Sequence, residues 1–175
     1  MSDAPKIPES KSPFWRFSIK FYQVPGVAPA CIELQDQAGV DVNVLFFLLW
    51  LAAQSRALNK EQVAEIERAI GAWREMAVVP IRNVRRALKS PPPVMSAEAA
   101  EGFRTRIKAV ELEAERLQQE ALFQMAERGP LGSAAGSPLE AAKASVSAYQ
   151  AVLRPFPAAP LEAIFSAFAK FDPPR

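Results

Sequence analysis

Three acidic residues near the N-terminus are the first candidates for chemistry. Glu33 and Asp36 are three residues apart, so they share a face on a helix, and Asp41 follows five residues later. Paired carboxylates at this spacing could hold Mg²⁺, but that chemistry normally needs a second acidic helix opposite the first. The other acids are scattered among arginines and lysines, which is typical of solvated faces. We therefore expect capping and surface-charge roles here, and no metal site.

Nucleophilic or redox chemistry would depend on Cys31, because it is the only cysteine among 175 residues and the chain has no histidine. The lack of histidine excludes Ser-His-Asp and Cys-His catalysis and removes the commonest metal ligand. A single cysteine forms neither an internal disulfide nor a multi-cysteine zinc site. We interpret Cys31 as a small buried hydrophobe rather than a nucleophile or redox sensor. No catalytic residue and no cofactor are expected.

A group of polar and aromatic residues around one apolar segment forms the candidate ligand pocket. Asn43 opens this segment two residues after Asp41, and its amide either fixes a loop backbone or orients a ligand. A cavity beside it would be lined by Phe14, Phe17, Phe21, Phe46, Phe47 and Trp50. The alternative is that the aromatic side chains simply fill a core. The pocket candidates are Trp15, Asp36, Asp41, Asn43 and Trp50.

A basic cluster is the candidate partner-binding site. The segment between Met76 and Ala97 contains no acid and holds Arg82, Arg85, Arg86 and Lys89. Such a patch suits an acidic protein partner, or nucleic acid or anionic lipid. It also suits a role in stabilising a helix C-terminus and in solubility. No helix-turn-helix, zinc-finger or RNA-binding signature is present, so nucleic acid is the less favoured partner.

The most apolar stretch, residues 44–53, decides between a membrane anchor and a core helix. Ten residues make about 15 Å of helix, whereas the hydrocarbon layer needs about 20 residues. The stretch is apolar around nearly its whole circumference, which predicts a helix surrounded by other helices. Residues 1–15 contain acids and prolines where a signal peptide needs a basic start and an apolar run. We therefore expect a cytoplasmic protein without a transmembrane segment.

Capping and breaking residues predict an all-α, single-domain bundle. Expected caps are Ser12, Asp41, Ser96 and Ser137, with a capping box from Asn59 to Gln62 and a left-handed C-terminal cap at Gly39. Pro80 should kink or restart the helix that contains it. Helices are predicted from Pro13 and over about residues 27–38, 42–57, 60–89, 97–128, 138–153 and 161–171, and no strand is predicted.

Two apolar stripes on either side of the turn at residues 90–95 predict a long antiparallel hairpin, about 60–89 with 97–128. Facing positions of such a pair have numbers with a constant sum. A sum of 187 joins Leu88 with Ala99, Val84 with Phe103, Ala77 with Val110, Trp73 with Ala114, Ile70 with Leu117 and Ile66 with Ala121.

Composition divides the chain into four parts. Residues 1–11 are expected to be a flexible N-terminus, residues 12–128 the helical bundle, residues 129–137 a linker rich in glycine, serine and alanine, and residues 138–175 a smaller helical extension. The net charge of +2 favours neither extensive DNA binding nor an acidic tail.

Residues 12–52 also carry a recognisable pattern. It consists of Ser-Pro-Phe-Trp at 12–15, Tyr22, Pro-Gly-Val at 25–27, Cys31, Leu-Gln-Asp at 34–36, Gly39, Asp-Val-Asn at 41–43 and Leu-Trp-Leu at 49–51. It resembles the opening of a proteobacterial family of conserved hypothetical proteins, although Ile32 stands where that family has leucine. The resemblance implies a bacterial cytosolic protein and carries no assigned activity.

Two hypotheses follow for function. The preferred one is a non-enzymatic protein that binds another protein through a basic or apolar surface left over after folding. The alternative is a small-molecule carrier, or an enzyme acting on an apolar substrate, that uses a pocket beside the aromatic helices.

Overall fold

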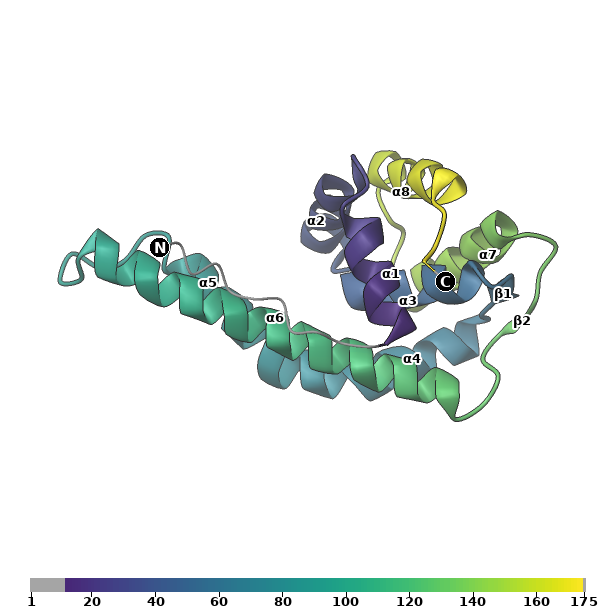
Figure 1. The fold of residues 1–175 in the computed structure, drawn as a ribbon, viewed down its shortest axis with the longest axis horizontal. Coiled ribbons are helices and arrows are strands. Elements are labelled where there is room, and N and C mark those ends of the chain that lie inside the picture. The colour runs from purple at the N-terminus through teal and green to yellow at the C-terminus, as the bar shows by residue number, and fades with distance from the viewer. Residues whose placement is uncertain (1–11, 175) are drawn as a thin grey trace.

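The computed structural model describes residues 12–174, and residues 1–11, expected to be flexible, lie outside the described residues. The fold is all-α, as predicted, with one very small sheet (Figure 1). Its elements in chain order are α1 (Pro13–Tyr22), α2 (Val27–Ala38), α3 (Val42–Ala52), β1 (Arg56–Ala57), α4 (Lys60–Trp73), the π-helical turn η1 (Arg74–Val78), α5 (Val79–Ala87), α6 (Ala97–Glu127), β2 (Ser133–Ala134), α7 (Pro138–Val152) and α8 (Ala158–Lys170).

The helix ends form where short-range signals place them. The Ser12 hydroxyl accepts a hydrogen bond from the Trp15 backbone N–H. Gly39 closes α2 in the left-handed conformation, with φ of 69°, where a glycine has no Cβ to clash. Asn59 and Gln62 form both hydrogen bonds of the predicted capping box. These bonds satisfy backbone groups that the first and last turns of a helix leave unpaired.

α3 ends at Ala52, five residues before the predicted end at residue 57. The backbone turns at Ser55, whose φ is 56°, and then pairs in antiparallel register with a segment from a distant part of the chain. Arg56 lies opposite Ala134, and Ala57 lies opposite Ser133. The expectation of no strand was therefore wrong for these two short pieces, because their pairing depends on contacts that no local pattern encodes.

α3 forms the centre of the body, by which we mean α1–α4, α7, α8 and the end of α6 from Leu122. Every residue from Val44 to Leu49 is buried, and Phe14, Phe17 and Phe21 of α1 are fully buried near it. Ring contacts hold this layer together, with Phe14 against Phe47 at 5.3 Å between ring centroids. The predicted core helix is confirmed, and no helix within residues 12–174 has the length and apolar character needed to cross a bilayer.

The C-terminal helices complete the same core. α7 packs on α3 and α4, and α8 packs on α2. Residues 129–137, expected to be a flexible linker, are tied to the body because the Arg56 guanidinium donates to the carbonyls of Leu131 (2.5 Å) and Gly132 (2.7 Å). A Cβ at Gly132 would lie 2.7 Å from the Ala57 carbonyl oxygen, so only glycine fits at this close approach.

The arm, consisting of η1, α5 and α6 up to Ala121, projects away from the body toward the turn of the hairpin (Figure 1). It forms the distal part of the predicted hairpin, and the Trp73 indole donates to the Ala114 carbonyl at 3.0 Å, as the predicted pairing of these residues implies. The predicted seam is wrong further along. Phe103, Val110 and Leu117 are 43 %, 51 % and 42 % exposed.

The register and the buried face both differ beyond η1. Arg82 with Glu111, Arg82 with Glu115 and Arg85 with Glu111 have sums of 193, 197 and 196 instead of 187. On α6, Glu111 and Gln118 are buried, each next to a residue that the stripe had placed in the seam, whereas Ala114 is buried as the stripe predicts. In the other helical segment of the hairpin, the π-helical turn η1 adds one residue shortly before Pro80. Proline has no backbone N–H to donate to the helix. Arg85 therefore faces α6 where an uninterrupted helix would present Val84.

Candidate functional site

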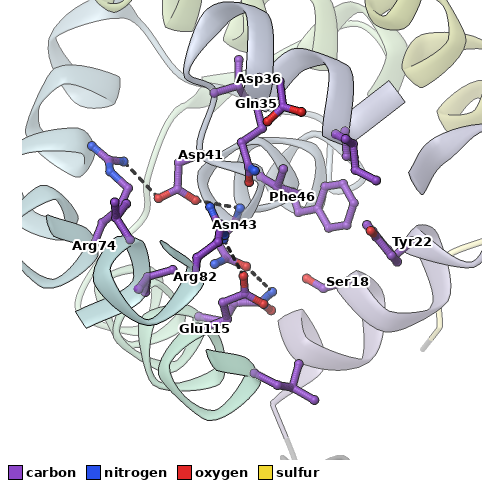
Figure 2. Close-up of a pocket in the computed structure, with 18 of the residues that line it drawn as sticks. Ser18, Tyr22, Gln35, Asp36, Asp41, Asn43, Phe46, Arg74, Arg82 and Glu115 are labelled. Carbon is purple, nitrogen blue, oxygen red and sulfur yellow. Dashed lines mark hydrogen bonds and ion pairs between the residues drawn. The ribbon is translucent and has the colours of Figure 1, made fainter. Parts of the chain in front are cut away.

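A cleft of about 670 Å³ lies between the body and the arm. The body contributes α1, α2 and α3, and the arm side contributes η1, α5 and α6. Its walls mix polar and apolar side chains. Figure 2 shows Asp41, Asn43, Arg82 and Glu115 close together, at what we call the polar end of the cleft, with the ring of Phe46 beside them. A volume of this order is typical of pockets that bind small organic molecules.

Asp41, the N-cap of α3, anchors the polar end. Its carboxylate accepts hydrogen bonds from the backbone N–H groups of Asn43 (2.9 Å) and Val44 (3.3 Å), which are otherwise unpaired at a helix start. It also accepts from the Gln118 amide at 2.6 Å and pairs with the Arg74 guanidinium at 3.0 Å. Asp41 is buried, so these four contacts fix its position at the junction of three helices.

Behind Asp41, Tyr149 and Glu67 hold this end of the cleft from the core. The Arg74 guanidinium pairs with Glu67 at 2.8 Å, and the Tyr149 hydroxyl donates to Glu67 at 2.5 Å while it accepts from the Asp41 backbone N–H at 3.1 Å. Burial, together with the charges of Glu67 and Asp41, raises the pKa of Tyr149 well above its ordinary value. The phenol therefore stays protonated and serves as a structural donor.

A second ion-pair cluster crosses the seam of the arm. Arg82 donates to Glu111 (2.9 Å) and Glu115 (2.7 Å), and Arg85 also pairs with Glu111. Glu115 and Arg82 line the cleft. Burial raises the pKa of Glu115, and the charges of nearby carboxylates raise it further. The Arg82 guanidinium lowers this pKa, but not enough to return it to its ordinary value. Glu115 thus binds a proton more readily than an exposed glutamate.

Two polar groups in the cleft wall lack partners. Ser18 is only 4 % exposed, and its hydroxyl oxygen has no hydrogen-bond partner among the described residues. Figure 2 shows this hydroxyl directed toward the side of the cleft on which Asn43 and Glu115 lie. The Gln119 amide donates to Asn43 at 2.8 Å, but its own carbonyl oxygen is buried without a partner in residues 12–174. Buried polar groups of this kind normally have partners.

Part of the cleft wall is apolar. Trp15, Phe46, Val78 and Leu112 contribute aromatic and aliphatic surface, and Ile32 stands at the rim with 52 % exposure. The cleft therefore combines hydrogen-bonding groups with hydrophobic surface, which is the usual composition of a small-molecule site.

The structure brings together four of the five predicted pocket residues. Trp15, Asp36, Asp41 and Asn43 line the cleft, whereas Trp50 does not. Trp50 instead packs on Phe14, Phe47 and Phe123. The predicted aromatic cavity is filled, since Phe14, Phe17, Phe21 and Phe47 are fully buried in the core, and of that predicted lining only Phe46 reaches the cleft.

The predicted basic patch is divided between two places. Arg82 and Arg86 line the cleft, and Arg86 pairs with Asp36 at 3.2 Å across it. Arg85 is engaged in the seam of the arm with Glu111, while Lys89 is exposed near the turn. Three of the four cations are thus neutralised within the chain.

The two remaining sequence candidates are Glu33 and Cys31. The Glu33 carboxylate accepts from the Gln37 amide at 2.9 Å, whereas Asp36 faces Arg86, so the two acids are occupied separately. Cys31 is 1 % exposed, and burial raises the pKa of its thiol to about 12. A thiol with that pKa is almost fully protonated at neutral pH, which fits the interpretation of Cys31 as a core residue.

Ser18, Glu115 and Gln119 were missed from the sequence. A signal existed for Ser18, because it is four residues after Phe14 and three before Phe21 and therefore lies on the apolar face of its helix. Glu115 and Gln119 had no such signal, since their placement depends on which face of α6 meets α5.

Comparison with known proteins places the chain in a family. The family described as "Protein of unknown function (DUF2390)" matches residues 13–122. The chain belongs to this family. All residues that line the cleft fall within the matched segment, from Trp15 to Gln119. No curated protein and no solved structure matches the chain.

Proposed function

We propose that the protein binds a small amphipathic molecule in the cleft between body and arm. The observation that carries this proposal is the pair of buried oxygens without partners, Ser18 Oγ and Gln119 Oε1, in the wall of a hollow of about 670 Å³. A bound molecule with hydrogen-bond donors would satisfy both, and leaving them unpaired costs about 1–3 kcal/mol each.

Charge balance indicates the kind of molecule. The lining acids are Asp36, Asp41 and Glu115, and the lining cations are Arg74, Arg82 and Arg86. Each of these arginines pairs with one of these acids, so no net charge is left to bind a strongly anionic or cationic ligand. A molecule that is neutral or zwitterionic at its polar end therefore suits the site best.

The apolar part of the lining indicates that the ligand also has a hydrophobic portion. Trp15, Phe46 and Leu112 offer flat and branched hydrophobic surface, on which an aromatic or aliphatic portion of the ligand would bury its own apolar area. The ligand would enter past Ile32, the exposed residue at the rim.

The uncharged, solvatochromic dye Nile red tests this proposal. The full chain should bind the dye with increased fluorescence, and Val79→Trp should weaken binding at least tenfold, because Val79 lines the cleft and indole would fill part of it. Val94→Trp is the matched control, since Val94 is 86 % exposed in the turn of the hairpin. Equal dye affinity of Val79→Trp and the unmodified protein would contradict a site in this cleft.

A second measurement identifies the natural molecule. Native mass spectrometry of protein purified from its own cells should show an added mass that disappears in Val79→Trp and persists in Val94→Trp. Extraction should then release a neutral or zwitterionic amphipathic compound.

The proposal includes the bacterial cytoplasm as the location, as the resemblance of residues 12–52 implies.

Protein binding, the function preferred from the sequence, is the second candidate. The observation that favours it is a set of exposed apolar side chains on the arm, among them Phe103, Val110 and Leu117. Single exposed hydrophobic residues are common on protein surfaces, but an ordered row of them is typical of an interface. Replacing Val110 by glutamate should abolish such binding without unfolding a residue that is already half exposed.

A further inference from the structure

The exposed apolar side chains of the arm share one face of α6. Phe103, Val110 and Leu117 are separated by seven residues each, which corresponds to nearly two full helical turns. They therefore form a row along the helix, and their exposed fractions are 43 %, 51 % and 42 %. Ala99 and Ala121 are exposed as well and extend the row at its two ends.

This row lies on the side of the arm away from the cleft. Val110 and Leu117 each precede a buried residue of α6, Glu111 and Gln118, by one position, which is a rotation of about 100°. The residues one position after these two are Leu112 and Gln119, and both line the cleft. The row and the cleft thus occupy opposite sides of α6.

Val84 of α5 belongs to the same outer face. It precedes Arg85, which pairs with Glu111 across the arm, by one residue. In an antiparallel pair of helices, residues one position before the facing residues point to the same side of both helices. Val84 is 45 % exposed, so the outer face of the arm, formed by Ala99, Phe103, Val110, Leu117 and Ala121 with Val84 beside them, has apolar side chains from both helices.

We propose that the outer face of the arm docks on the same face of a second copy of this chain, with the two α6 helices antiparallel around a two-fold axis at Val110. This proposal rests on the second candidate function and names the partner. The first support is the spacing of the row. From Ala99 to Ala121 the steps are four, seven, seven and four residues, which read the same in both directions. A two-fold interface requires this property, because each patch must complement itself.

The side chains that this two-fold axis brings together also match in size. Around Val110, Phe103 of one copy meets Leu117 of the other, and Ala99 meets Ala121. The largest side chain of the row thus faces a branched aliphatic one at both ends of the interface, while alanines allow close approach outside them. Val110 meets its own copy at the axis.

Charge supplies the second support. Arg106 lies four residues before Val110 and Glu113 lies three residues after it, so both flank the row on the same side of the helix. The two-fold axis brings Arg106 of one copy to Glu113 of the other, twice. Within residues 12–174 Arg106 makes no ion pair and rests 5.6 Å over the Phe103 ring. Glu113 is 43 % exposed and pairs with Arg116 of its own helix at 2.8 Å, so Arg106 of the second copy would share this carboxylate with Arg116. A second copy presents both a cation and an anion to this pair of residues, which a uniformly anionic lipid surface or nucleic acid does not.

Cross-linking through introduced cysteines tests the axis directly. In a Cys31→Ser background, Val110→Cys should form a covalent dimer under mild oxidation at least tenfold faster than Val94→Cys at equal protein concentration. Val94 is the more exposed residue, at 86 % against 51 %, so random collision predicts the reverse order. Faster cross-linking through Val94→Cys would overturn the proposal.

Light scattering of the full chain with charge variants tests the register. The unmodified protein should dimerise with increasing concentration, Arg106→Glu and Glu113→Arg should each weaken the dimer at least fivefold, and the double variant should recover most of the loss. Circular dichroism should be the same for all variants, because these side chains are exposed at the surface. A monomer at every concentration up to about 1 mM would overturn the proposal. If the protein stays monomeric but captures a different protein through Val110, the proposal of protein binding is supported and the proposal of self-association is contradicted.

Discussion

The body and the arm use the same kind of sequence pattern for opposite purposes. In the body, α3 has neighbours on several sides, and every residue from Val44 to Leu49 is buried. In the arm, two helices stand alone, and their seam is crossed by Arg82, Arg85 and Glu111. Two helices cannot exclude water from all their apolar residues, so the arm keeps an apolar row on its outer face. Periodicity identifies a face, but the number of neighbouring elements decides whether that face is buried.

Removing one aromatic ring from each region should give the largest contrast. We expect Phe47→Ala in the body to lower the free energy of unfolding by about 3–5 kcal/mol, because a fully buried ring leaves a cavity. Phe103→Ala in the arm should cost less than about 1 kcal/mol, since this ring is 43 % exposed. Urea unfolding monitored by circular dichroism measures both. Similar losses would show that the arm is buried against something in solution, as the proposed second copy would require at high concentration.

Removing one arginine from each region should give the next largest contrast. Arg74→Met leaves Asp41 and Glu67 buried without their cation, and we expect a loss of about 2–4 kcal/mol, somewhat reduced because Arg74 is itself 22 % exposed. Arg104→Met removes the partner of Glu101, an exposed pair on the arm, and should leave the midpoint of urea unfolding unchanged. Equal effects would mean that the Asp41 cluster is hydrated.

Ser18→Ala, at the boundary of the two regions, should change the free energy of unfolding by a smaller amount and should raise it instead of lowering it. The variant removes a buried hydroxyl without a partner, so the empty protein should gain up to about 1 kcal/mol of stability. The same variant should weaken binding of the molecule that co-purifies with the protein. Thermal unfolding with and without the extracted compound separates these effects. A loss of stability in the empty protein would show that the hydroxyl already has a partner.

Two glutamates of the arm should respond oppositely to pH, with the smallest effects. Burial disfavours ionised Glu111, but Arg85 and Arg82 outweigh this and lower its pKa, whereas burial dominates for Glu115 and raises its pKa. Ionised Glu111 therefore stabilises the fold above about pH 4.3, and this contribution is lost as the pH falls through the lowered pKa. Glu115 contributes stability when protonated, and this is lost as the pH rises through the raised pKa.

Urea unfolding at pH 3.5 and pH 7 checks both signs. Glu111→Gln should be more harmful, relative to the unmodified protein, at pH 7 than at pH 3.5. Glu115→Gln should become relatively more favourable at pH 7, because glutamine does not titrate. Two variants that shift in the same direction would contradict the different environments of these carboxylates.

The parts of the fold that depend on short-range contacts could be predicted from the sequence. Ser12, Gly39 and Asn59 act within a few residues along the chain, so their capping roles were visible. The β1–β2 pair could not be predicted, because Arg56 and Ala134 are far apart in sequence and two residues are too short for a periodic pattern. The hairpin was predicted, but its seam is displaced beyond η1, where the π-helical turn interrupts the regular spacing.

The candidate site was predictable on the body side and not on the arm side. Asp41 and Asn43 border an apolar helix, and that contrast marks them as unusual in the sequence alone. Glu115 and Gln119 belong to a helix with many polar residues, where only the rotation of α6 decides which of them reach the cleft. The sequence could not show that the arginines of the basic cluster are paired, because their acidic partners lie on other helices.

The position of Tyr149 has a consequence for how the chain folds during its synthesis. Its hydroxyl joins Glu67 to the start of α3, although it lies in α7, beyond the segment that the family covers. While the ribosome is still translating the residues before α7, the carboxylate of Glu67 lacks this donor and one side of α3 stays uncovered. The N-terminal half therefore lacks part of its final packing, and one apolar side of α3 stays exposed, until the last helices have emerged.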